Sequence, residues 1–358
     1  MKALLLTAPS KLEFVDFPDP RPADDEVLLR IRACGICGSD IHGWDGSTGR
    51  RQTPLIMGHE ASGEIIATGS RVEEWRIGDR VTFDSTISCG TCRFCQRGQI
   101  NLCENRRVVG VSPAEYKQHG AFAEQLALPA RILYRLPDTL SFEHAAMIEP
   151  VSIAVHAVQR VTVASTDTAV VVGSGMIGLL VVQALRWAGA RQIVAIDLAD
   201  NRLALARQLG ATHTLNSGSA DVTAEISRLT EGLGAELAFE VVGLTPTVNL
   251  ALAVLKRGGA CVLVGNLAPK TQDFPLQAAV TKELTIMGSC ASAGEYPLCL
   301  DLIARGVIDV RPMIEAVVPL ADGAAWFPRL SAKDGGQYMK VILSPSPTGA
   351  PTGNRTPL

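Results

Sequence analysis

The stretch AVVVGSGMIGLLVVQAL, residues 169–185, decides the fold of the second half of the chain. Its first four apolar residues predict a buried strand over 169–172, and the apolar run after the glycines predicts a helix over 177–188. The run approaches the length of a membrane helix, but three glycines interrupt it and Arg186 closes it. The stretch therefore predicts a strand, a tight turn and a buried helix.

The segments after this unit repeat its pattern. Strands are predicted over 192–196, 237–242 and 260–264, and a helix over 201–209. Strands that alternate with helices form a parallel sheet with helices on its faces. The sequence therefore predicts an α/β fold with a doubly wound domain, and the alternation ends after Leu284.

The glycines have the spacing G-x-G-x-x-G between a predicted strand and a predicted helix. In that context they permit a tight turn and close approach of a pyrophosphate to the helix N-terminus. Asp197 follows the next predicted strand, about 20 residues on, where a carboxylate accepts hydrogen bonds from a ribose. A 2′-phosphate would face that charge, and Leu198 offers no pairing cation, so NAD is favoured over NADP.

Arg202 has two open interpretations, a contact over the adenine or a solvated helix residue. The predicted cofactor-binding residues are Gly173, Gly175, Met176, Ile177, Gly178, Asp197 and Arg202.

The composition restricts the other possibilities. A chain of 358 residues predicts two domains, and 47% hydrophobic with 19% charged residues indicates a well-cored globular protein. The net charge of −3 gives no electrostatic reason to expect nucleic acid. The apolar run after Met1 ends at Thr7, too short for a signal peptide, so a first strand and a cytoplasmic location are expected.

The first third of the chain reads as strands. In the segment 26–34, Val27, Leu29 and Ile31 point to one face and Leu28, Arg30 and Arg32 to the other, which predicts a strand. Short strands are also expected over 63–68 and 80–83. Residues 141–161 are helical in pattern, and Pro150 limits any unbroken helix there. The segment 344–358 is rich in Pro, Gly and Thr and is expected to be a flexible tail without a catalytic role.

Four of the nine cysteines have the spacing C-x2-C-x2-C-x7-C. Four thiolates in one short loop suit a tetrahedral structural zinc ion and leave no open position. An iron–sulfur cluster is the rival, but the last gap is longer than in bacterial ferredoxins and no second cysteine set exists. The predicted structural zinc ligands are Cys89, Cys92, Cys95 and Cys103.

A second metal-binding pattern is divided among three segments. Cys37 follows Cys34 in a C-x-x-C spacing, His59 and Glu60 stand in GHE, and Glu149 precedes Pro150. A mixed set of sulfur, nitrogen and oxygen ligands with an exchangeable water is typical of catalytic zinc. Spacing alone does not establish that these segments meet in space.

The motifs GICGSDIH, GHE, the four-cysteine loop, EPVSIAVHA and GSGMIG occur in one order along the chain. In that order the chain resembles the zinc-dependent medium-chain alcohol dehydrogenases, over about residues 1–343, and most of all their sorbitol (polyol) dehydrogenase branch. The resemblance implies a β-rich GroES-like catalytic domain split around a Rossmann domain that binds NAD. The expected boundaries are 1–150 for the first part of the catalytic domain, 151–287 for the Rossmann domain, 288–343 for the return and 344–358 for the tail.

The resemblance also implies roles at the catalytic zinc. Cys37 and His59 match its ligands, Glu149 the third position near the metal, and Glu60 a neighbouring acid that can act through water or alternate as ligand. Cys34 matches no ligand position, so it is interpreted as a buried strand cysteine rather than half of a redox pair.

Three further residues match a proton path. Ser39 matches the hydroxyl that passes on the alcohol proton, and His42 the outer relay group. Asp40 matches the acid that orients the histidine ligand.

The implied function is the interconversion of a secondary alcohol of a polyol or sugar-type substrate and its ketone, with two zinc ions per chain and NAD. The alternatives left open are a threonine dehydrogenase-like or polyol-phosphate dehydrogenase, and a cofactor-binding structural protein. No membrane or nucleic-acid partner is expected, and the resemblance implies a homo-oligomer, a tetramer or a dimer.

Several other residues are expected to be ordinary core or surface residues. Phe122 is expected in the core, whereas Trp44 could line the substrate site or the core. The remaining histidines, His119, His144, His156 and His213, and the buried small cysteines expected at Cys261, Cys290 and Cys299, receive no functional role.

Overall fold

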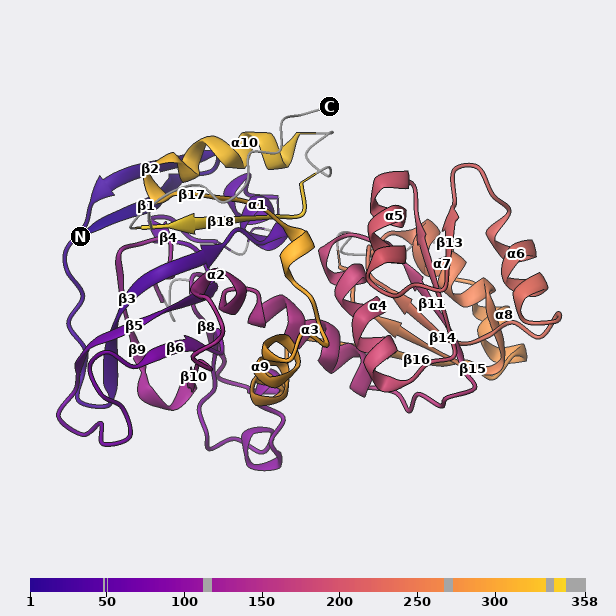
Figure 1. Ribbon diagram of the computed structural model, residues 1–358, viewed down its shortest axis with the longest axis horizontal. Helices are drawn as coiled ribbons and strands as arrows, with labels where there is room; N and C mark the ends of the chain where they lie inside the picture. Colours follow the sequence, from indigo (N-terminus) through magenta and orange to yellow (C-terminus); the bar gives the residue numbers. More distant parts are fainter. Residues whose placement is uncertain (48, 50, 112–117, 267–272, 333–337, 346–358) are drawn as a thin grey trace. The chain divides into compact units, whose positions relative to one another are not determined.

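The computed structural model describes residues 1–47, 49, 51–111, 118–266, 273–332 and 338–345 (Figure 1). Most of the expected tail lies outside these residues. The chain divides into two compact units. The first comprises Met1–Ile87, Arg107–Met147 and Ile314–Leu358, and the second Ser88–Arg106 and Ile148–Met313. The four-cysteine loop thus belongs to the second compact unit, while the domain boundaries stated above stay predictions.

The first unit is built on β3 (Glu26–Gly35), the longest strand of its main sheet. Val27, Leu29 and Ile31 are completely buried and Arg30 between them is exposed, as the alternation predicts. The seven-stranded sheet has the order β10-β6-β5-β3-β18-β17, and β9 also pairs with β3. The other strands of this sheet are β5 (Glu60–Thr68), β6 (Arg80–Phe83), β9 (Gln125–Pro129), β10 (Leu133–Arg135), β17 (Ile314–Pro319) and β18 (Lys340–Ser344).

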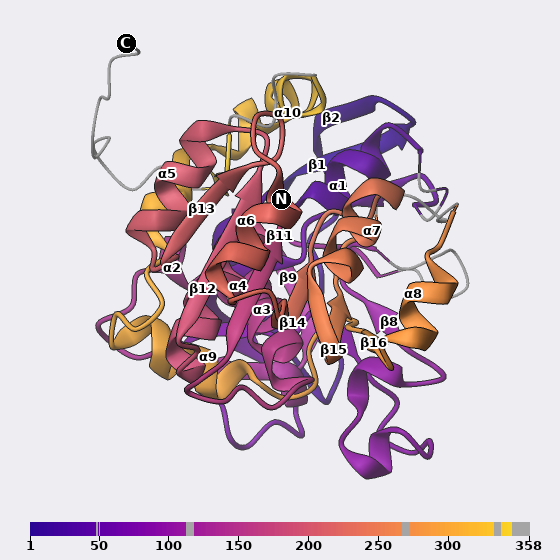
Figure 2. The same ribbon diagram turned by 90° about the vertical axis from the view of Figure 1, so that its right-hand side faces the viewer.

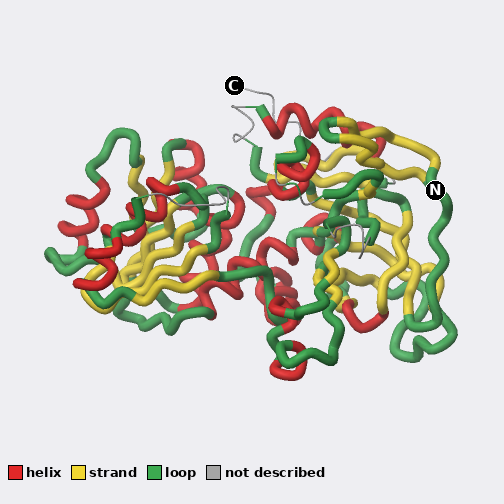
Figure 3. Tube along the Cα trace, turned by 180° about the vertical axis from the view of Figure 1, so that it is seen from behind, coloured by secondary structure: helices red, strands yellow, loops and turns green. Residues whose placement is uncertain are grey.

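Smaller elements complete the first unit (Figure 3). A three-stranded sheet has the order β2-β1-β4, and β7 pairs with β8. The bounds of these elements are β1 (Lys2–Ala8), β2 (Lys11–Asp16), β4 (Leu55–Ile56), β7 (Thr86–Ile87), β8 (Arg107–Val108), α1 (Gly38–Trp44), α2 (Phe142–Ala145) and α10 (Trp326–Ser331).

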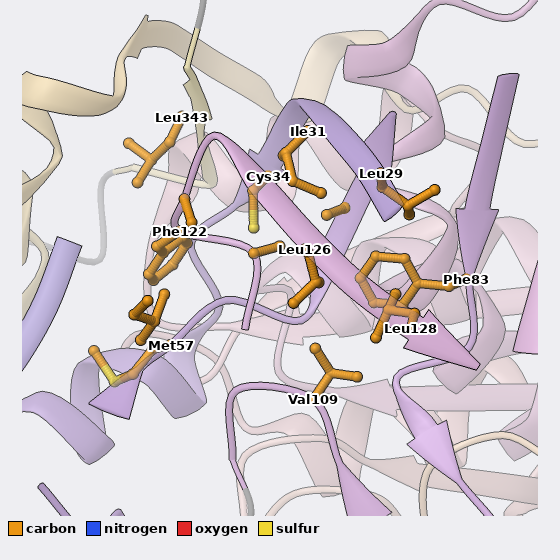
Figure 4. Packing of buried hydrophobic residues seen from close by; sticks show 14 of the residues in the cluster. Leu29, Ile31, Cys34, Met57, Phe83, Val109, Phe122, Leu126, Leu128 and Leu343 are labelled. Atoms are coloured by element: carbon orange, nitrogen blue, oxygen red, sulfur yellow. The ribbon is translucent and has the colours of Figure 1, made fainter. Parts of the chain in front are cut away.

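The core of the first unit packs around the strands just described (Figure 4). Phe122 is completely buried in it, as predicted, and its ring meets that of Phe327 edge to face. Trp44 is partly buried against the same cluster, with its ring 5.9 Å from that of Phe327. Cys34 is buried here as well, and burial raises the pKa of its thiol well above the ordinary value. Cys34 and Cys37 are both free, and Cys34 lies inside β3, as expected for a buried strand cysteine.

The second unit contains the predicted parallel sheet. Its six strands have the order β13-β12-β11-β14-β15-β16, which Figure 2 shows from one edge to the other, and every pairing is parallel. The order reverses between β12 and β14 on either side of β11, which is where such sheets bind ligands. The strands are β11 (Thr168–Val172), β12 (Gln192–Asp197), β13 (His213–Asn216), β14 (Ala235–Glu240), β15 (Leu255–Leu263) and β16 (Thr285–Gly288).

The helices of the second unit include the predicted ones with bounds shifted by one residue. Pro150 lies in the first turn of α3, where its missing N–H has no intrahelical partner to lose. Among the residues that the structure describes, no helix combines the length and apolarity of a membrane span. The helices are α3 (Ile148–Gln159), α4 (Met176–Ala188), α5 (Asp200–Gln208), α6 (Val222–Leu229), α7 (Thr245–Ala253), α8 (Leu276–Thr281) and α9 (Tyr296–Ala304).

Candidate active site

Cys37 stands between the end of β3 and the start of α1. Its backbone is extended, with φ −88° and ψ 152°, and its Sγ accepts a hydrogen bond from the Ser39 N–H at 3.4 Å. In return the Cys37 N–H donates to Asp40 Oδ2 at 3.1 Å. This reciprocal cap fixes the position of the sulfur at the start of α1.

Three of the predicted metal ligands lie together. One donor atom each from Cys37, His59 and Glu60 lies within 4.8 Å of the others. His59, immediately before β5, and Glu60, its first residue, are 5% and 1% exposed. A thiolate, an imidazole and a carboxylate at such separations fit a catalytic zinc ion. Glu149 lies in the first turn of α3, in the second unit, and its place at this site stays a prediction.

The buried carboxylate of Asp40 defines the tautomer of His59. Asp40 Oδ1 lies 3.4 Å from His59 Nδ1, and the other charged group near this oxygen among the described residues is Arg51, whose Nη2 is 3.5 Å away. On the other side of the ring, Nε2 lies 3.4 Å from Ser39 Oγ. A proton on Nδ1, facing the carboxylate, leaves the lone pair of Nε2 available to a metal.

The Asp40–His59 pair also shifts the pKa values of both side chains. Burial alone would lower the pKa of His59, but the charge and hydrogen bond of Asp40 outweigh it and raise the pKa well above its ordinary value. Burial likewise opposes ionisation of Asp40, but the charges of His59 and Arg51 hold the pKa of that carboxyl below its usual range. Asp40 is therefore an anion at neutral pH.

Lys340 is a site residue that the sequence did not reveal. Its Nζ lies 2.5 Å from Glu60 Oε2 and donates to the Ile36 carbonyl at 3.1 Å. Both side chains are almost completely buried, at 3% and 1% exposed. Glu60 also lies over Gly35, where a Cβ would come within 2.3 Å of its carboxylate oxygen. The position of the Glu60 carboxylate therefore depends on a cation from the last strand.

Arg51 is the second such residue. Its Nη2 lies 3.2 Å from the Ser39 carbonyl, 3.4 Å from Ser39 Oγ and 3.5 Å from Asp40 Oδ1, and its side chain is 3% exposed. His42, by contrast, is half-exposed, and its Nδ1 lies 4.0 Å from Asp45 Oδ2. Nothing in the local pattern around Arg51 distinguishes it from an exposed loop arginine.

The four cysteines of the predicted structural zinc site also lie together. Their sulfurs are all within 4.8 Å of one another, with Cys89–Cys95 at 3.9 Å and Cys92–Cys95 at 3.5 Å. A tetrahedron with Zn–S bonds of about 2.3 Å has S–S edges of about 3.8 Å. Cys103 completes the set, and the geometry fits zinc.

This loop is held by a side-chain network from elsewhere in the second unit. Asn101 donates to the Cys290 carbonyl at 2.8 Å and lies 3.4 Å from His156 Nε2. The other ring nitrogen of His156 lies 2.6 Å from Glu295 Oε1. His156 is therefore part of a polar network within the second unit. The expectation that Cys290 is buried was wrong, because Cys290 follows the edge strand β16 and is exposed.

The predicted dinucleotide turn joins β11 to α4. Gly173 has φ +100°, and a Cβ there would meet Val242 Cγ2 at 2.5 Å. At Gly178 a Cβ would lie 1.9 Å from the Gly173 carbonyl, so helix and turn pack too closely for any side chain. Gly175, the N-cap of α4, has open space where its Cβ would be. Met176 and Ile177 begin α4, so the glycine turn leads directly into a helix N-terminus, the kind of position that binds phosphate groups.

Asp197 is the last residue of β12, beside this turn, and its carboxylate accepts hydrogen bonds from the backbone. Its Oδ1 accepts from the Leu198 and Ala199 N–H groups at 2.8 and 3.0 Å, and its Oδ2 from the Ser174 N–H at 2.7 Å. Arg202 Nη1 lies 3.6 Å from the same Oδ2. Asp197 thus ties the glycine turn to the next strand, a role that the sequence did not indicate, and a contact of Arg202 with adenine stays a prediction.

Two family descriptions match the two parts of the chain. Residues 23–138 match the family described as alcohol dehydrogenase GroES-like domain. Residues 177–305 match the family described as zinc-binding dehydrogenase. These regions contain seven of the eight predicted metal ligands and the cofactor turn from Ile177 onward.

Curated relatives cover almost the whole chain. A sorbitol dehydrogenase of Bacillus subtilis is 34% identical over 319 residues, which are 88% of this chain and 89% of that protein. A D-arabitol-phosphate dehydrogenase of Enterococcus avium is 33% identical over 353 residues, or 97% of this chain and 98% of the relative.

Solved structures have the same fold. An Escherichia coli oxidoreductase/dehydrogenase of unknown specificity superposes with a TM-score of 0.90 at 30% identity, over 96% of this chain and 98% of that one. A putative zinc-binding dehydrogenase from Sinorhizobium meliloti, bound to NADP, superposes with a TM-score of 0.88 at 30% identity. The match covers 96% of this chain and 99% of that one. An Escherichia coli alcohol dehydrogenase complexed with NADH gives 0.88 at 29% identity over the same shares. The chain is therefore a member of the zinc-dependent medium-chain alcohol dehydrogenase family.

Proposed function

We propose that this protein oxidises a secondary alcohol of a polyol or sugar-type substrate to the ketone, and catalyses the reverse reduction, with zinc and NAD. The main support for the proposal is that one donor atom each of Cys37, His59 and Glu60 lies within 4.8 Å of the other two. A closed four-cysteine site and a glycine turn of the dinucleotide type stand in the same chain. A cofactor-binding protein without chemistry would have no need of the mixed donor set.

Cys37 and His59 would hold the catalytic zinc, with Glu60 or Glu149 as the third protein ligand. When bound, zinc supplies Lewis acidity that makes a substrate hydroxyl more acidic. The chain's own part is to present a thiolate and a neutral imidazole, and the Asp40 contact with Nδ1 prepares that tautomer. Lys340 offsets the charge of Glu60 when that carboxylate does not face the metal.

The glycine turn, Asp197 and the start of α4 would hold NAD. When bound, the nicotinamide supplies the acceptor for the hydride, so the alcohol loses a hydride and a proton and NAD⁺ becomes NADH. The Asp197 carboxylate, held in place by three backbone N–H groups, disfavours a 2′-phosphate. The Sinorhizobium meliloti relative is bound to NADP, so both cofactors belong in the assay.

The proton would leave through Ser39. Its exposed hydroxyl would take the proton of the substrate hydroxyl and release its own proton toward His42 and water. Ser39 and His42 are three residues apart on α1, so their side chains share one side of the helix.

The substrate class follows from the relatives. Those named above act on sorbitol and D-arabitol phosphate by their names, and a D-xylulose reductase A of Aspergillus oryzae is 34% identical over 93% of this chain. A polyol phosphate is the second candidate, supported by the D-arabitol-phosphate relative and by a galactitol-1-phosphate dehydrogenase structure with a TM-score of 0.88. Oxidation of threonine stays a third possibility.

A substrate panel tests the proposal. Purified protein with a measured zinc content is assayed with polyols, polyol phosphates, sugar acids, threonine and simple diols, each with NAD and with NADP. We expect two zinc ions per chain and NADH formation with an unphosphorylated polyol. Activity with phosphorylated substrates alone would select the second candidate, and inactivity with every alcohol would reject both.

Assembly, location and domain boundaries belong to the same proposal. We expect a cytoplasmic homo-oligomer, dimer or tetramer, with domains at 1–150, 151–287 and 288–343. The exposed apolar residues Leu276 and Val280 on α8, at 67% and 65%, support association through the second unit. Light scattering on the purified protein measures the number of subunits.

A further inference from the structure

Arg51 is a buried cation that the reaction outlined above does not use. Its side chain is 3% exposed, and its Nε has no hydrogen-bond partner among the residues with described positions. Burying a guanidinium is unfavourable unless other groups compensate for its lost hydration. Among the described residues, the polar contacts of its Nη2 are to Ser39 and Asp40.

Both contacted residues adjoin the reacting atoms of the proposed function. Ser39 Oγ lies 3.4 Å from His59 Nε2, and Asp40 Oδ1 lies 3.4 Å from His59 Nδ1. One guanidinium thus contacts the hydroxyl expected to pass the proton and the carboxylate that orients a metal ligand. Asp40 is completely buried, and Arg51 places a permanent positive charge 3.5 Å from its Oδ1.

A glycine keeps Arg51 in this place. A Cβ on Gly43 would lie 2.6 Å from Arg51 Cγ and 2.9 Å from its Nε. The arginine stem therefore passes directly over α1 at a residue without a side chain. Because the nearest atom is the inner Cγ and not the flexible end, any larger residue at position 43 would displace the whole side chain.

We propose that Arg51 is the positioning residue for proton transfer at Ser39. The inference rests on the proposed dehydrogenase function and concerns the same site. Nη2 donates to one lone pair of Ser39 Oγ, which leaves the other lone pair to accept the substrate proton and directs the serine O–H away from Arg51.

The positive charge also sets the order of the transfer. As the substrate O–H bond breaks, a proton joins Ser39 Oγ while the O–H bond of the serine breaks and its proton passes toward His42 and water. A cation beside Oγ favours negative over positive charge on that oxygen. Ser39 therefore releases its own proton no later than it accepts the new one.

The test compares Arg51→Met with Arg51→Lys and with Arg71→Met, which removes an exposed arginine of the same unit. All are assayed with the polyol that the wild type turns over best. We expect Arg51→Met to lower kcat about 10- to 100-fold, as for loss of a charge-assisted hydrogen bond, with KM changed less than about threefold. The solvent deuterium isotope effect on kcat should rise, and Arg51→Lys should recover much of the loss.

Two measurements separate positioning from a structural role. Zinc content and the visible spectrum of the cobalt-substituted protein should be the same in Arg51→Met and wild type, since Cys37 and His59 are untouched. Arg51→Met should also cost nothing further in a Ser39→Ala background, because it acts through that hydroxyl. Loss of one zinc, a changed cobalt spectrum, or full additivity with Ser39→Ala would overturn the proposal.

Gly43→Ala provides a second variant, which displaces the guanidinium while Arg51 itself stays in the chain. Alanine in a helix is more favourable than glycine by about 1 kcal/mol, so the helix itself gains stability. We expect kcat to fall as in Arg51→Met because the guanidinium is displaced. Wild-type activity in both Gly43→Ala and Arg51→Met refutes the inference alone, whereas an inactive wild type refutes the dehydrogenase function instead.

Discussion

Lys340 Nζ lies 2.5 Å from Glu60 Oε2, and both side chains are buried beside the candidate catalytic metal site. Removing one member of a buried ion pair leaves an uncompensated charge, which costs about 3–5 kcal/mol. We therefore expect Lys340→Met to lower the free energy of unfolding of the first unit by about 3 kcal/mol, measured by urea unfolding. The paired variant Lys340→Met with Glu60→Gln should recover most of it, and an unchanged urea midpoint in Lys340→Met would contradict the prediction.

Cys37→Ala tests the separation of the two functions of the chain. The thiolate belongs to the metal site of the first unit, while the glycine turn belongs to the second. We expect zinc to fall from two to one per chain, turnover to disappear, and NADH binding, followed by fluorescence titration, to stay within about threefold of wild type. Cys34→Ala is the control because it removes a buried thiol outside the metal set. A Cys37→Ala protein that no longer binds NADH would show that the two sites are not separable.

The four-cysteine loop makes a prediction about thiol reactivity after zinc removal. Hydrogen bonds from the Thr91 backbone and hydroxyl lower the pKa of Cys89 to about 5. The pKa of Cys95 is raised to about 11, and burial is the largest cause. At pH 7 Cys89 is a thiolate, and only about one Cys95 in 10⁴ is. The lower basicity of Cys89 offsets up to about 10³ of that advantage, so about a tenfold faster alkylation remains.

Mass spectrometry of chelator-treated protein after a short iodoacetamide pulse gives the alkylation rates of Cys89 and Cys95. The Cys95 rate should increase about tenfold per pH unit from 7 to 9, because deprotonation limits it, while the Cys89 rate stays flat. Equal rates at pH 7, or parallel pH dependence, would disagree with these pKa directions.

Local sequence patterns predicted most of the fold. The strand, glycine turn and helix at 169–188 follow from a few neighbouring residues, and so do the alternation in β3 and the cysteine spacing. The contact between Glu60 and Lys340 joins residues 280 positions apart, and no local pattern encodes it. Arg51 is near its partners in sequence, but its burial depends on the missing side chain of Gly43. The sequence thus indicated which groups could bind metal, and the fold determined which charges surround them.

Asp197 has a larger structural role than its expected contact with ribose. Asp197→Ala removes the acceptor for the Ser174, Leu198 and Ala199 N–H groups as well as the negative charge. We expect KM for NAD to rise at least about tenfold and the preference for NAD over NADP to weaken, since a charged hydrogen bond is worth about 1.5–3 kcal/mol. Steady-state kinetics with both cofactors measure this, with Leu198→Ala, an exposed neighbour, as the control. Equal use of NAD and NADP by the wild type would remove the basis of the prediction.

The Glu295–His156–Asn101 network should control how firmly the zinc loop is held. Asn101 belongs to the loop, His156 to α3, and Glu295 immediately precedes α9. Glu295→Gln keeps the shape but weakens the charged hydrogen bond to His156, which should speed zinc release to a chelator about tenfold. The rate is measured in a Cys37→Ala background so that only the four-cysteine site contributes, and His213→Ala controls for loss of a histidine elsewhere in the unit.

The pH dependence of this effect has a definite sign. Burial opposes ionisation of Glu295, but hydrogen bonds from His156 and the Ala293 N–H outweigh it and hold the pKa of the carboxyl below its ordinary value. A carboxyl with a depressed pKa contributes stability above its ordinary pKa and loses it as the pH falls through the folded value. The difference in thermal midpoint between wild type and Glu295→Gln should therefore be full from pH 6 to 8 and shrink below the ordinary carboxyl range. A difference that grew toward acid pH would exclude an ionised Glu295 as the group that holds the loop.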